Sequence, residues 1–212
     1  MLVPTPVYHI THLRNLAGII AAGGLRCHRH LCAQSTQYTD IAHRNIQDRR
    51  ADTPVPCGPG GNLHDYVPLY FAPRSPMLYA ISRGNVEGYA GGQKPVAHLV
   101  TTAQAIAAAG CGFVFTDGHA VVSVTGFHDD LGRLGAIDWP LMQEPYWYDT
   151  DDDNDRKRRR QAEFLVHQSL PWELVTEIGV LDKGVQCEVA KELGQIKHCP
   201  RISVRPEWYY DP

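Results

Sequence analysis

The chain has 212 residues, of which 43% are hydrophobic and 20% are charged, and its formal net charge at pH 7 is −3. This composition is that of a globular protein, the length suits a single domain, and the acidic total argues against a uniformly basic nucleic-acid-binding protein. No apolar run approaches the ~18 residues that cross a bilayer, and the N-terminal stretch MLVPTPVYHITHLRN lacks the features of a signal peptide. We therefore expect a soluble, cytoplasmic protein with no membrane partner.

The first third of the chain predicts one strand and two helices. VYHI at 7–10 is a short strand, and the apolar residues of 12–24 recur at helical spacing before a Gly-Gly stop. Residues 25–38 are polar and His-rich, which is typical of a loop. A second helix is predicted over 39–50, and the Pro/Gly-rich stretch 53–62 is a loop.

The remaining two thirds mix strands with short helices. Strands are predicted at 66–73, 95–102, 112–117, 162–168, 175–182 and from 201. Helices are predicted from the Ser-Pro start at 75, at 102–110, within 128–142 and at 184–196. These elements show no regular βαβ alternation and no internal repeat. The fold class is therefore α+β, with residues 1–212 forming one domain.

One segment concentrates opposite charges. Residues 149–155, DTDDDND, contain five Asp and no cation, and RKRRR follows at once at 156–160. Without the acidic run the rest of the chain is mildly basic, so cationic surface patches can exist despite the acidic total. We interpret 149–160 as a mobile, charged, variable loop that leads to the strand beginning at Glu163.

The six cysteines show no CxxC spacing, and we expect free thiols. The stretch CHRHLC at 27–32 offers metal-ligating residue types, but no second cluster with paired spacing follows it. We therefore expect no metal site. The chain also lacks GxGxxG, GxxxxGK[ST], GxSxG and HExxH motifs, which argues against several common nucleotide-binding and hydrolytic sites.

Three local features have residue types suited to chemistry. In YHITH, strand alternation sends His9 and Thr11 to one face, so His9 is either a core histidine or a hydrogen-bonding group in a site. The second feature is QDRR followed by NLHDYVPLYF, which brings cations close to aromatic residues. Such a combination suits phosphate and base contacts, although a solvated helix end explains it equally well.

The third feature is Glu163, at the start of the strand 162–168. Alternation places Glu163, Leu165 and His167 on one face, and Ala162, Phe164 and Val166 on the other. A carboxylate that leads an apolar strand faces either a cleft or the wet end of the strand. From the residue alone, an ordinary surface charge is the simpler reading, because exposed Glu is common.

These features lie within longer blocks: PTPVYHITHLRNL, IAHRNIQDRR, PGGNLHDYVPLYFAPRSPMLYAI, GFVFTDGHAV, RRQAEFLVH and EWYY. With these blocks, in this order from about residue 4 to 210, the chain resembles the DarT family, the DNA ADP-ribosyltransferase toxins of DarTG toxin–antitoxin systems. The segment HDYVPLYFAPRSPMLYAI is much more specific than a short motif. The acidic run 149–155 is not part of the resemblance.

The resemblance implies an ADP-ribosyltransferase-like fold, in which a split central β-sheet core with surrounding helices grips NAD⁺ in a cleft. It implies transfer of ADP-ribose from NAD⁺, the co-substrate, to a base in single-stranded DNA, typically thymidine. It also implies a partner, a macrodomain antitoxin of the DarG type that removes the modification.

The resemblance also implies roles for individual residues. By position, Arg50 and Glu163 match the catalytic residues, although helix phase decides whether Arg50 or Arg49 points inward. The residues that match NAD⁺ contacts are His9, Thr11, Asn15 and Tyr70. The residues expected near the DNA are Arg74, Met77 and His119.

Two alternatives to the thymidine hypothesis remain open at this point. One keeps the ADP-ribosyltransferase but changes the acceptor to guanine, RNA or a protein. The other is a non-catalytic single-strand nucleic-acid-binding module on the same fold. The second is disfavoured because the positions that match the family's catalytic Arg and Glu are intact.

Overall fold

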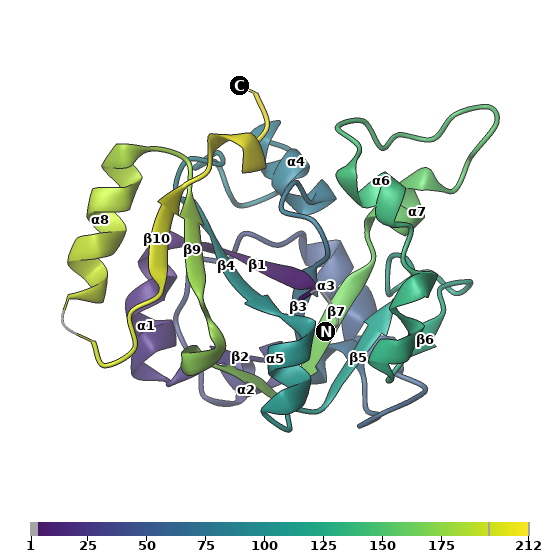
Figure 1. Ribbon diagram of the computed structural model, residues 1–212, viewed down its shortest axis with the longest axis horizontal. Helices are drawn as coiled ribbons and strands as arrows, with labels where there is room; N and C mark the ends of the chain where they lie inside the picture. Colours follow the sequence, from purple (N-terminus) through teal and green to yellow (C-terminus); the bar gives the residue numbers. More distant parts are fainter. Residues whose placement is uncertain (1–3, 195, 212) are drawn as a thin grey trace.

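The computed structural model describes residues 4–194 and 196–211, and its centre is an eight-stranded sheet (Figure 1). The strand order is β10-β9-β4-β1-β3-β7-β5-β6. The bounds are β1 (Pro6–His12), β3 (Tyr66–Tyr70), β4 (Val96–Thr102), β5 (Phe113–Thr116), β6 (Phe127–His128), β7 (Glu163–His167), β9 (Glu177–Val180) and β10 (Arg201–Val204). Strands β9 and β10 pair in parallel, and the other pairings in the described sheet are antiparallel. The predicted α+β class is confirmed.

The sheet is divided between β1 and β3. Strand β1 pairs with β4 through seven registered positions, and β3 pairs with β7 through five. Between β1 and β3 the register has one pair, Tyr8 opposite Tyr70. Neighbouring strands in a continuous sheet stay about 5 Å apart along the ladder, so a single pair means that the two halves diverge. This divergence is the expected split of the central sheet.

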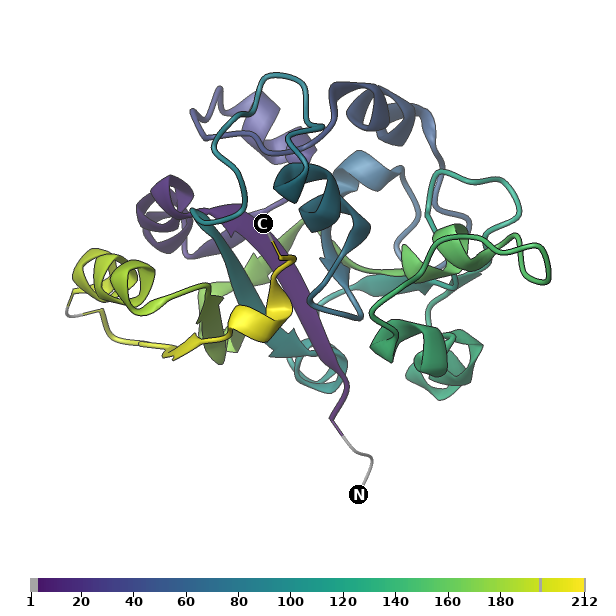
Figure 2. The same cartoon turned by 90° about the horizontal axis from the view of Figure 1, so that it is seen from above.

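Short helices surround the sheet. They are α1 (Leu16–Ala21), α2 (His28–Ala33), α3 (Arg44–Asp52), α4 (Pro76–Ser82), α5 (Ala103–Ala108), α6 (Trp139–Gln143), α7 (Arg156–Arg160) and α8 (Lys183–Leu193). The segments that hold α2, α3 and α4 lie together on one side of the strands (Figure 2). A small second sheet joins β2 (Gly24–Arg26) to β8 (Ser169–Pro171). Within the described residues, no helix combines the length and apolarity needed to span a membrane.

Strand β7 alternates as its sequence predicts. Phe164 and Val166 are fully buried in the largest core cluster, whereas Leu165 is buried in a separate cluster with Tyr66 and Val114. Both faces of this strand are therefore covered by apolar side chains, which fixes its register. Glu163 shares the face of Leu165 and is held at a rigid position.

Two segments that we expected to be loops contain regular structure. Residues 25–38 include β2 and α2. Strand β2 forms because Leu25 pairs with Leu170, a residue far away in the sequence that the polarity of 25–38 does not predict. The loop interpretation of 149–160 is wrong for its second half, which forms α7. Lys and Arg are good helix formers, and nearby carboxylates offset their mutual repulsion: Lys157 pairs with Asp149 and Arg159 with Asp153.

The close approach of β2 to β8 yields a first prediction. Gly24 has φ of +142°, and a Cβ at this position would collide with the backbone of Leu170 and Trp172. We expect Gly24→Ala to lower the free energy of unfolding by more than about 1 kcal/mol, measured by urea denaturation. Gly18→Ala is the matched control, because no atom lies within 4 Å of its added Cβ. Equal stability of the two variants would contradict this account.

Candidate active site

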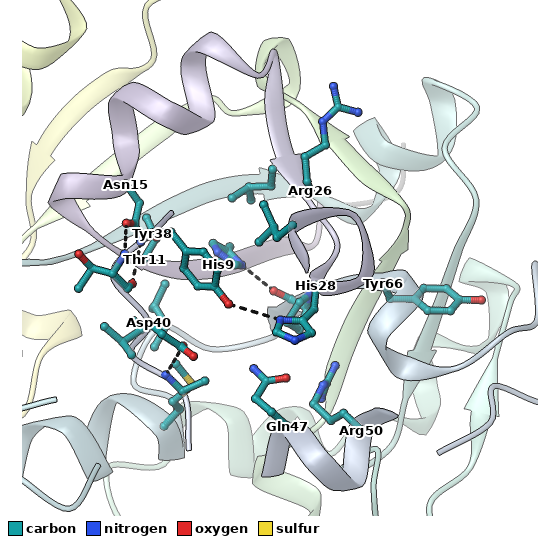
Figure 3. Close-up of a pocket in the computed structure, with 18 of the residues that line it drawn as sticks. His9, Thr11, Asn15, Arg26, His28, Tyr38, Asp40, Gln47, Arg50 and Tyr66 are labelled. Carbon is teal, nitrogen blue, oxygen red and sulfur yellow. Dashed lines mark hydrogen bonds between the residues drawn. The ribbon is translucent and has the colours of Figure 1, made fainter. Parts of the chain in front are cut away.

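The divergence between β1 and β3 opens onto a cavity of about 550 Å³. Its wall is built from β1, α1, α3, β3, β7 and the segment that follows α2 (Figure 3). Most of the predicted site residues line it: His9, Thr11, Asn15, Arg50, Tyr70, Met77, His119 and Glu163. The structure thus gathers residues from distant parts of the sequence around one space.

The centre of the wall is a buried ion pair. Arg50 Nη1 donates to Glu163 Oε2 at 2.8 Å, and the two side chains are 9% and 4% exposed. Helix α3 directs Arg50 inward, whereas Arg49 is exposed and donates to the carbonyl of Val121. The question of helix phase is therefore settled in favour of Arg50. Its Nη2 is buried and has no hydrogen-bond partner within the described residues, so it is free to bind a further acceptor.

The pair determines the charge state of Glu163. Burial opposes ionisation of this carboxyl, but the charge of Arg50, the neighbouring His119 and the hydrogen bond from Arg50 together outweigh it and hold the pKa of Glu163 below its usual range. Tyr70 lies directly opposite Glu163 in the register of β3 and β7. Burial, and then the charge of Glu163, raise the pKa of Tyr70, so its hydroxyl stays protonated.

The second oxygen of Glu163 faces the loop between β5 and β6. The backbone N–H of Ala120 donates to Oε1 at 3.3 Å, and His119 Nδ1 lies 3.7 Å from the same oxygen. The backbone N–H of Glu163 itself donates to Thr116 Oγ1 at 3.0 Å. The carboxylate is thus held from one side by α3 and from the other by this loop.

His9 crosses the divergence between the two halves of the sheet. Its Nδ1 lies 2.8 Å from the carbonyl oxygen of Pro68 on β3. A carbonyl can only accept, so Nδ1 carries the proton. Burial lowers the pKa of His9, which favours the neutral ring and leaves Nε2 as an acceptor. His9 lines the site and also connects its two walls.

Thr11 and Asn15 form a polar corner at the β1 end of the cavity. Asn15 Nδ2 donates to Thr11 Oγ1 at 3.1 Å and to the carbonyl of Thr39 at 3.0 Å. Asn15 Oδ1 accepts from the backbone N–H of Thr39 at 2.8 Å. The amide of Asn15 is therefore engaged with the protein, and it fixes the segment that covers the cavity.

The residues expected near the DNA separate into two groups. Met77, at the start of α4, lines the cavity, and its Sδ accepts from the Tyr70 hydroxyl at 3.6 Å. Arg74 is not among the cavity-lining residues. Its guanidinium lies 4.6 Å from the centre of the Tyr210 ring, and its carbonyl accepts from Arg160 at 3.0 Å.

The cavity contains side chains that sequence reasoning did not assign to the site. The Tyr38 hydroxyl lies 3.4 Å from His28 Nδ1 (Figure 3). His64 Nε2 lies 3.2 Å from Gln47 Oε1. In the sequence, His64 belongs to NLHDYVPLYF, the stretch that follows QDRR. The polarity of 25–38 was the available signal, because a polar, His-rich segment next to a strand suits a cavity wall as well as a solvated loop.

The RKRRR run is engaged within the protein. Arg158 pairs with Asp117 and Asp155, and Arg160 donates to the carbonyls of Leu141 and Met142. Arg156 donates to the carbonyls of Tyr146 and Tyr148. The run is therefore not a patch of five free cations. Among the described residues, no cluster of three or more His, Cys, Asp or Glu is placed to hold a metal ion.

The family to which this architecture belongs follows from comparison with known proteins. The family model "ssDNA thymidine ADP-ribosyltransferase, DarT" matches residues 8–210. The chain belongs to the DarT family. A DNA ADP-ribosyl transferase from Thermus sp. (strain 2.9) is 48% identical over 209 residues, which cover 98% of this chain and 97% of that protein.

Solved structures of the Thermus sp. 2.9 DarT share the fold. Its complex with ADP-ribosylated single-stranded DNA superposes with a TM-score of 0.91, covering 98% of this chain and 97% of that chain at 48% identity. Its complex with NAD⁺ superposes with a TM-score of 0.87 at 45% identity, covering 98% of each chain. The expected DarT family and ADP-ribosyltransferase fold are confirmed.

A more distant relative joins two activities in one chain. It is a DNA ADP-ribosyl transferase–DNA ADP-ribosyl glycohydrolase fusion protein from Thermosipho africanus, 26% identical over 189 residues. The match covers 88% of this chain and 45% of the fusion protein. A DNA ADP-ribosyl transferase and a DNA ADP-ribosyl glycohydrolase are thus joined in that protein.

The buried pair predicts how stability depends on pH. The pKa of Glu163 is lowered from 4.5 to about 2 in the folded protein, so the stability that it contributes is present above pH 4.5 and is lost as pH falls from there through the folded value. Above pH 5 we expect Glu163→Gln to lower the free energy of unfolding by about 3 kcal/mol, because Arg50 is left buried without its partner. The difference from wild type should shrink as pH falls below about 4.5.

Urea denaturation at a series of pH values measures this difference. Exposed Glu173 provides the control, since Glu173→Gln should change stability by less than about 0.5 kcal/mol at every pH. A Glu163→Gln difference that stays constant down to pH 3 would show that the ion pair does not stabilise the fold.

Proposed function

We propose that the protein transfers ADP-ribose from NAD⁺ to thymidine in single-stranded DNA and is the toxin of a toxin–antitoxin pair. Membership of the DarT family supports the reaction class. The observation that carries the assignment to residues is the Arg50–Glu163 pair, which presents a free guanidinium N–H beside an ionised carboxylate in the cavity.

NAD⁺ occupies the part of the cavity between β1, α1 and α3 in this proposal. The volume of about 550 Å³ lies within the ~300–1,000 Å³ range of small-molecule sites. His9 Nε2 and Thr11 Oγ1 offer hydrogen bonds to sugar hydroxyls, Asn15 holds the covering segment in place, and Tyr70 packs against the nicotinamide. The NAD⁺ complex of the Thermus relative supports this role for the cavity.

Glu163 stabilises the transition state for cleavage of the nicotinamide–ribose bond. Breaking this bond develops oxocarbenium character at the anomeric carbon, so a fixed carboxylate beside the ribose interacts more strongly with the transition state than with the ground state. The hydrogen bonds from Arg50 and Ala120 hold Glu163 in place before the reaction. The low pKa keeps the carboxylate ionised at neutral pH.

The same pair recognises the acceptor base. Arg50 Nη2 is a donor and Glu163 is an acceptor, so together they complement an edge that has a carbonyl oxygen next to an N–H. Thymine has this edge at N3–H, and an unpaired strand exposes it. As Glu163 takes the N3 proton, negative charge moves onto the thymine carbonyl and is stabilised by Arg50.

Residues at the far side of the cavity hold the DNA. Met77 and Tyr70 give the unpaired base an apolar surface, and His119 lies beside the carboxylate that receives the proton. Arg74 lies outside the cavity, where it is placed to contact a phosphate of the flanking strand. The complex of the Thermus relative with ADP-ribosylated single-stranded DNA supports this arrangement.

Among the other bases, guanine fits the Arg50–Glu163 pair best, because its O6 and N1–H form the same edge of a carbonyl oxygen next to an N–H. Incubation of the protein with NAD⁺ and four oligonucleotides, each with one unpaired test base, separates the candidates. Mass spectrometry should find the added ADP-ribose on thymidine. Equal modification of guanosine, or modification of RNA or protein alone, would replace the acceptor in this proposal.

The biological context follows from the reaction. We propose a macrodomain antitoxin of the DarG type as the partner that removes the modification, in keeping with the Thermosipho fusion protein. We further propose that residues 1–212 act as one ADP-ribosyltransferase domain and that the protein works in the cytoplasm, where NAD⁺ and bacterial DNA occur together.

The decisive activity test is Glu163→Gln. We expect this variant to lose DNA modification by at least about 1,000-fold, because it lacks the charge opposite the oxocarbenium ion and the base for N3. Labelled NAD⁺ and a thymidine oligonucleotide measure the rate, and Glu173→Gln is the control. A non-catalytic binding module predicts no modification by wild type, and wild-type activity of Glu163→Gln would remove Glu163 from the mechanism.

A further inference from the structure

The loop 117–126 between β5 and β6 defines the surroundings of one carboxylate oxygen of Glu163. Oε2 is held by Arg50, whereas Oε1 meets the Ala120 N–H and the His119 ring. This loop contains no helix or strand, and a displacement of 1 Å would break both contacts. Contacts from outside the loop fix its position: Arg49 donates to the carbonyl of Val121, and a second arginine makes several more contacts.

Arg158 holds this loop through both its backbone and its side chain. The carbonyl of Arg158 accepts from the backbone N–H of His119 at 2.9 Å. Its Nη1 donates to Asp117 Oδ1 at 2.9 Å and to Thr125 Oγ1 at 3.3 Å. Asp117 and Thr125 lie near the two ends of the loop, so Arg158 binds the loop near both ends and at His119.

The partners of Arg158 extend the network within the loop. Thr125 Oγ1 donates to the carbonyl of His119 at 2.9 Å, and Asp117 Oδ1 accepts from the N–H of Gly126 at 3.0 Å. His119 is therefore bound at its N–H by Arg158 and at its carbonyl by a residue that Arg158 also contacts. The backbone of Arg158 thus binds His119 directly, and its guanidinium acts on His119 through Thr125.

The Arg158 side chain is built into the structure. It is 16% exposed, compared with 57% for Lys157, its neighbour in α7. A Cβ on Gly118 would collide with the Arg158 guanidinium, so the loop backbone lies directly against it. Asp155 fixes the guanidinium from the opposite side, with Nε and Nη2 each 2.7 Å from a carboxylate oxygen.

We infer that Arg158 is a positioning residue for ADP-ribose transfer, which sets loop 117–126 so that His119 and Ala120 face Glu163. This inference rests on the function proposed above. The inference also explains why the acidic and basic runs adjoin: Asp155, from the acidic run, binds the guanidinium that positions the loop. A DNA phosphate would have to displace two carboxylates to reach Arg158, so the residue does not serve the DNA backbone.

The test compares steady-state kinetics of the full chain with Arg158→Ala, using NAD⁺ and a thymidine oligonucleotide. We expect kcat to fall by about 10- to 100-fold, because a misplacement near 1 Å has an effect of this size. KM for NAD⁺ should stay unchanged, since the side-chain hydrogen bonds of Arg158 in the described residues go to Asp117, Thr125 and Asp155 and not to β1, α1 or α3. Arg158→Lys should recover part of kcat by restoring one bond to Asp117.

A double-mutant cycle tests whether Arg158 acts through the loop. Asp117→Ala should reproduce the loss of kcat, and the double variant should be no slower than either single one. Lys157→Ala is the matched control from the same helix, since its ion pair with Asp149 does not reach the loop. Should Arg158→Ala fail to fold, Gly118→Ala serves instead: its Cβ would collide with the guanidinium and separate it from the loop, so this variant too should lower kcat.

Three outcomes would overturn the inference. One is a wild-type kcat for Arg158→Ala. Another is a raised KM for the oligonucleotide at unchanged kcat, which would make Arg158 a DNA contact. The third is full additivity of the Arg158 and Asp117 substitutions. Glu163→Gln in the same assay separates the inference from the proposed function: if Glu163→Gln is inactive and Arg158→Ala has the wild-type kcat, only the role of Arg158 fails.

Discussion

The site depends on the divergence of two strands that a regular sheet would keep paired. Strands β1 and β3 share one registered pair, and beyond it their backbone groups need other partners. His9 supplies one through its bond to the carbonyl of Pro68. The divergence leaves Thr11 on one wall of the cavity and Glu163, through β7, on the other. A continuous ladder would close the space in which the two substrates must meet.

The sequence contains this arrangement only in part. Alternation correctly placed Glu163 on the face of Leu165, because side chains on a strand have a fixed period that needs no knowledge of the fold. Helix phase did not decide between Arg49 and Arg50, since both lie at the end of a polar helix with no apolar stripe to orient it. The ion pair joins residues 113 positions apart, and no local pattern encodes such a contact.

The charged junction shows a different limit of sequence reasoning. Composition identified opposite charges at 149–160 but did not show which carboxylate meets which cation. In the structure, both Arg158 and Arg159 pair with one carboxylate of the acidic run and one outside it. The outside partner is Asp117 for Arg158 and Asp138 for Arg159. A run of five cations next to a proposed DNA-modifying site invites a role in binding phosphate. Instead, each of the four arginines is bound within the protein, and Arg158 is part of the frame around the loop that faces Glu163.

The Arg50–Glu163 pair also affects how genetic screens of a toxin are interpreted. Such screens score the survival of cells, and a misfolded protein lets cells survive as readily as an inactive enzyme does. Neutralising one member of the pair removes a catalytic group and also strands a buried charge, so survival alone does not separate the two causes. Replacing both Arg50 and Glu163 with apolar residues of similar volume removes the catalytic groups and leaves no unpaired buried charge. Survivors of that design report on catalysis, provided that the protein accumulates to its normal level.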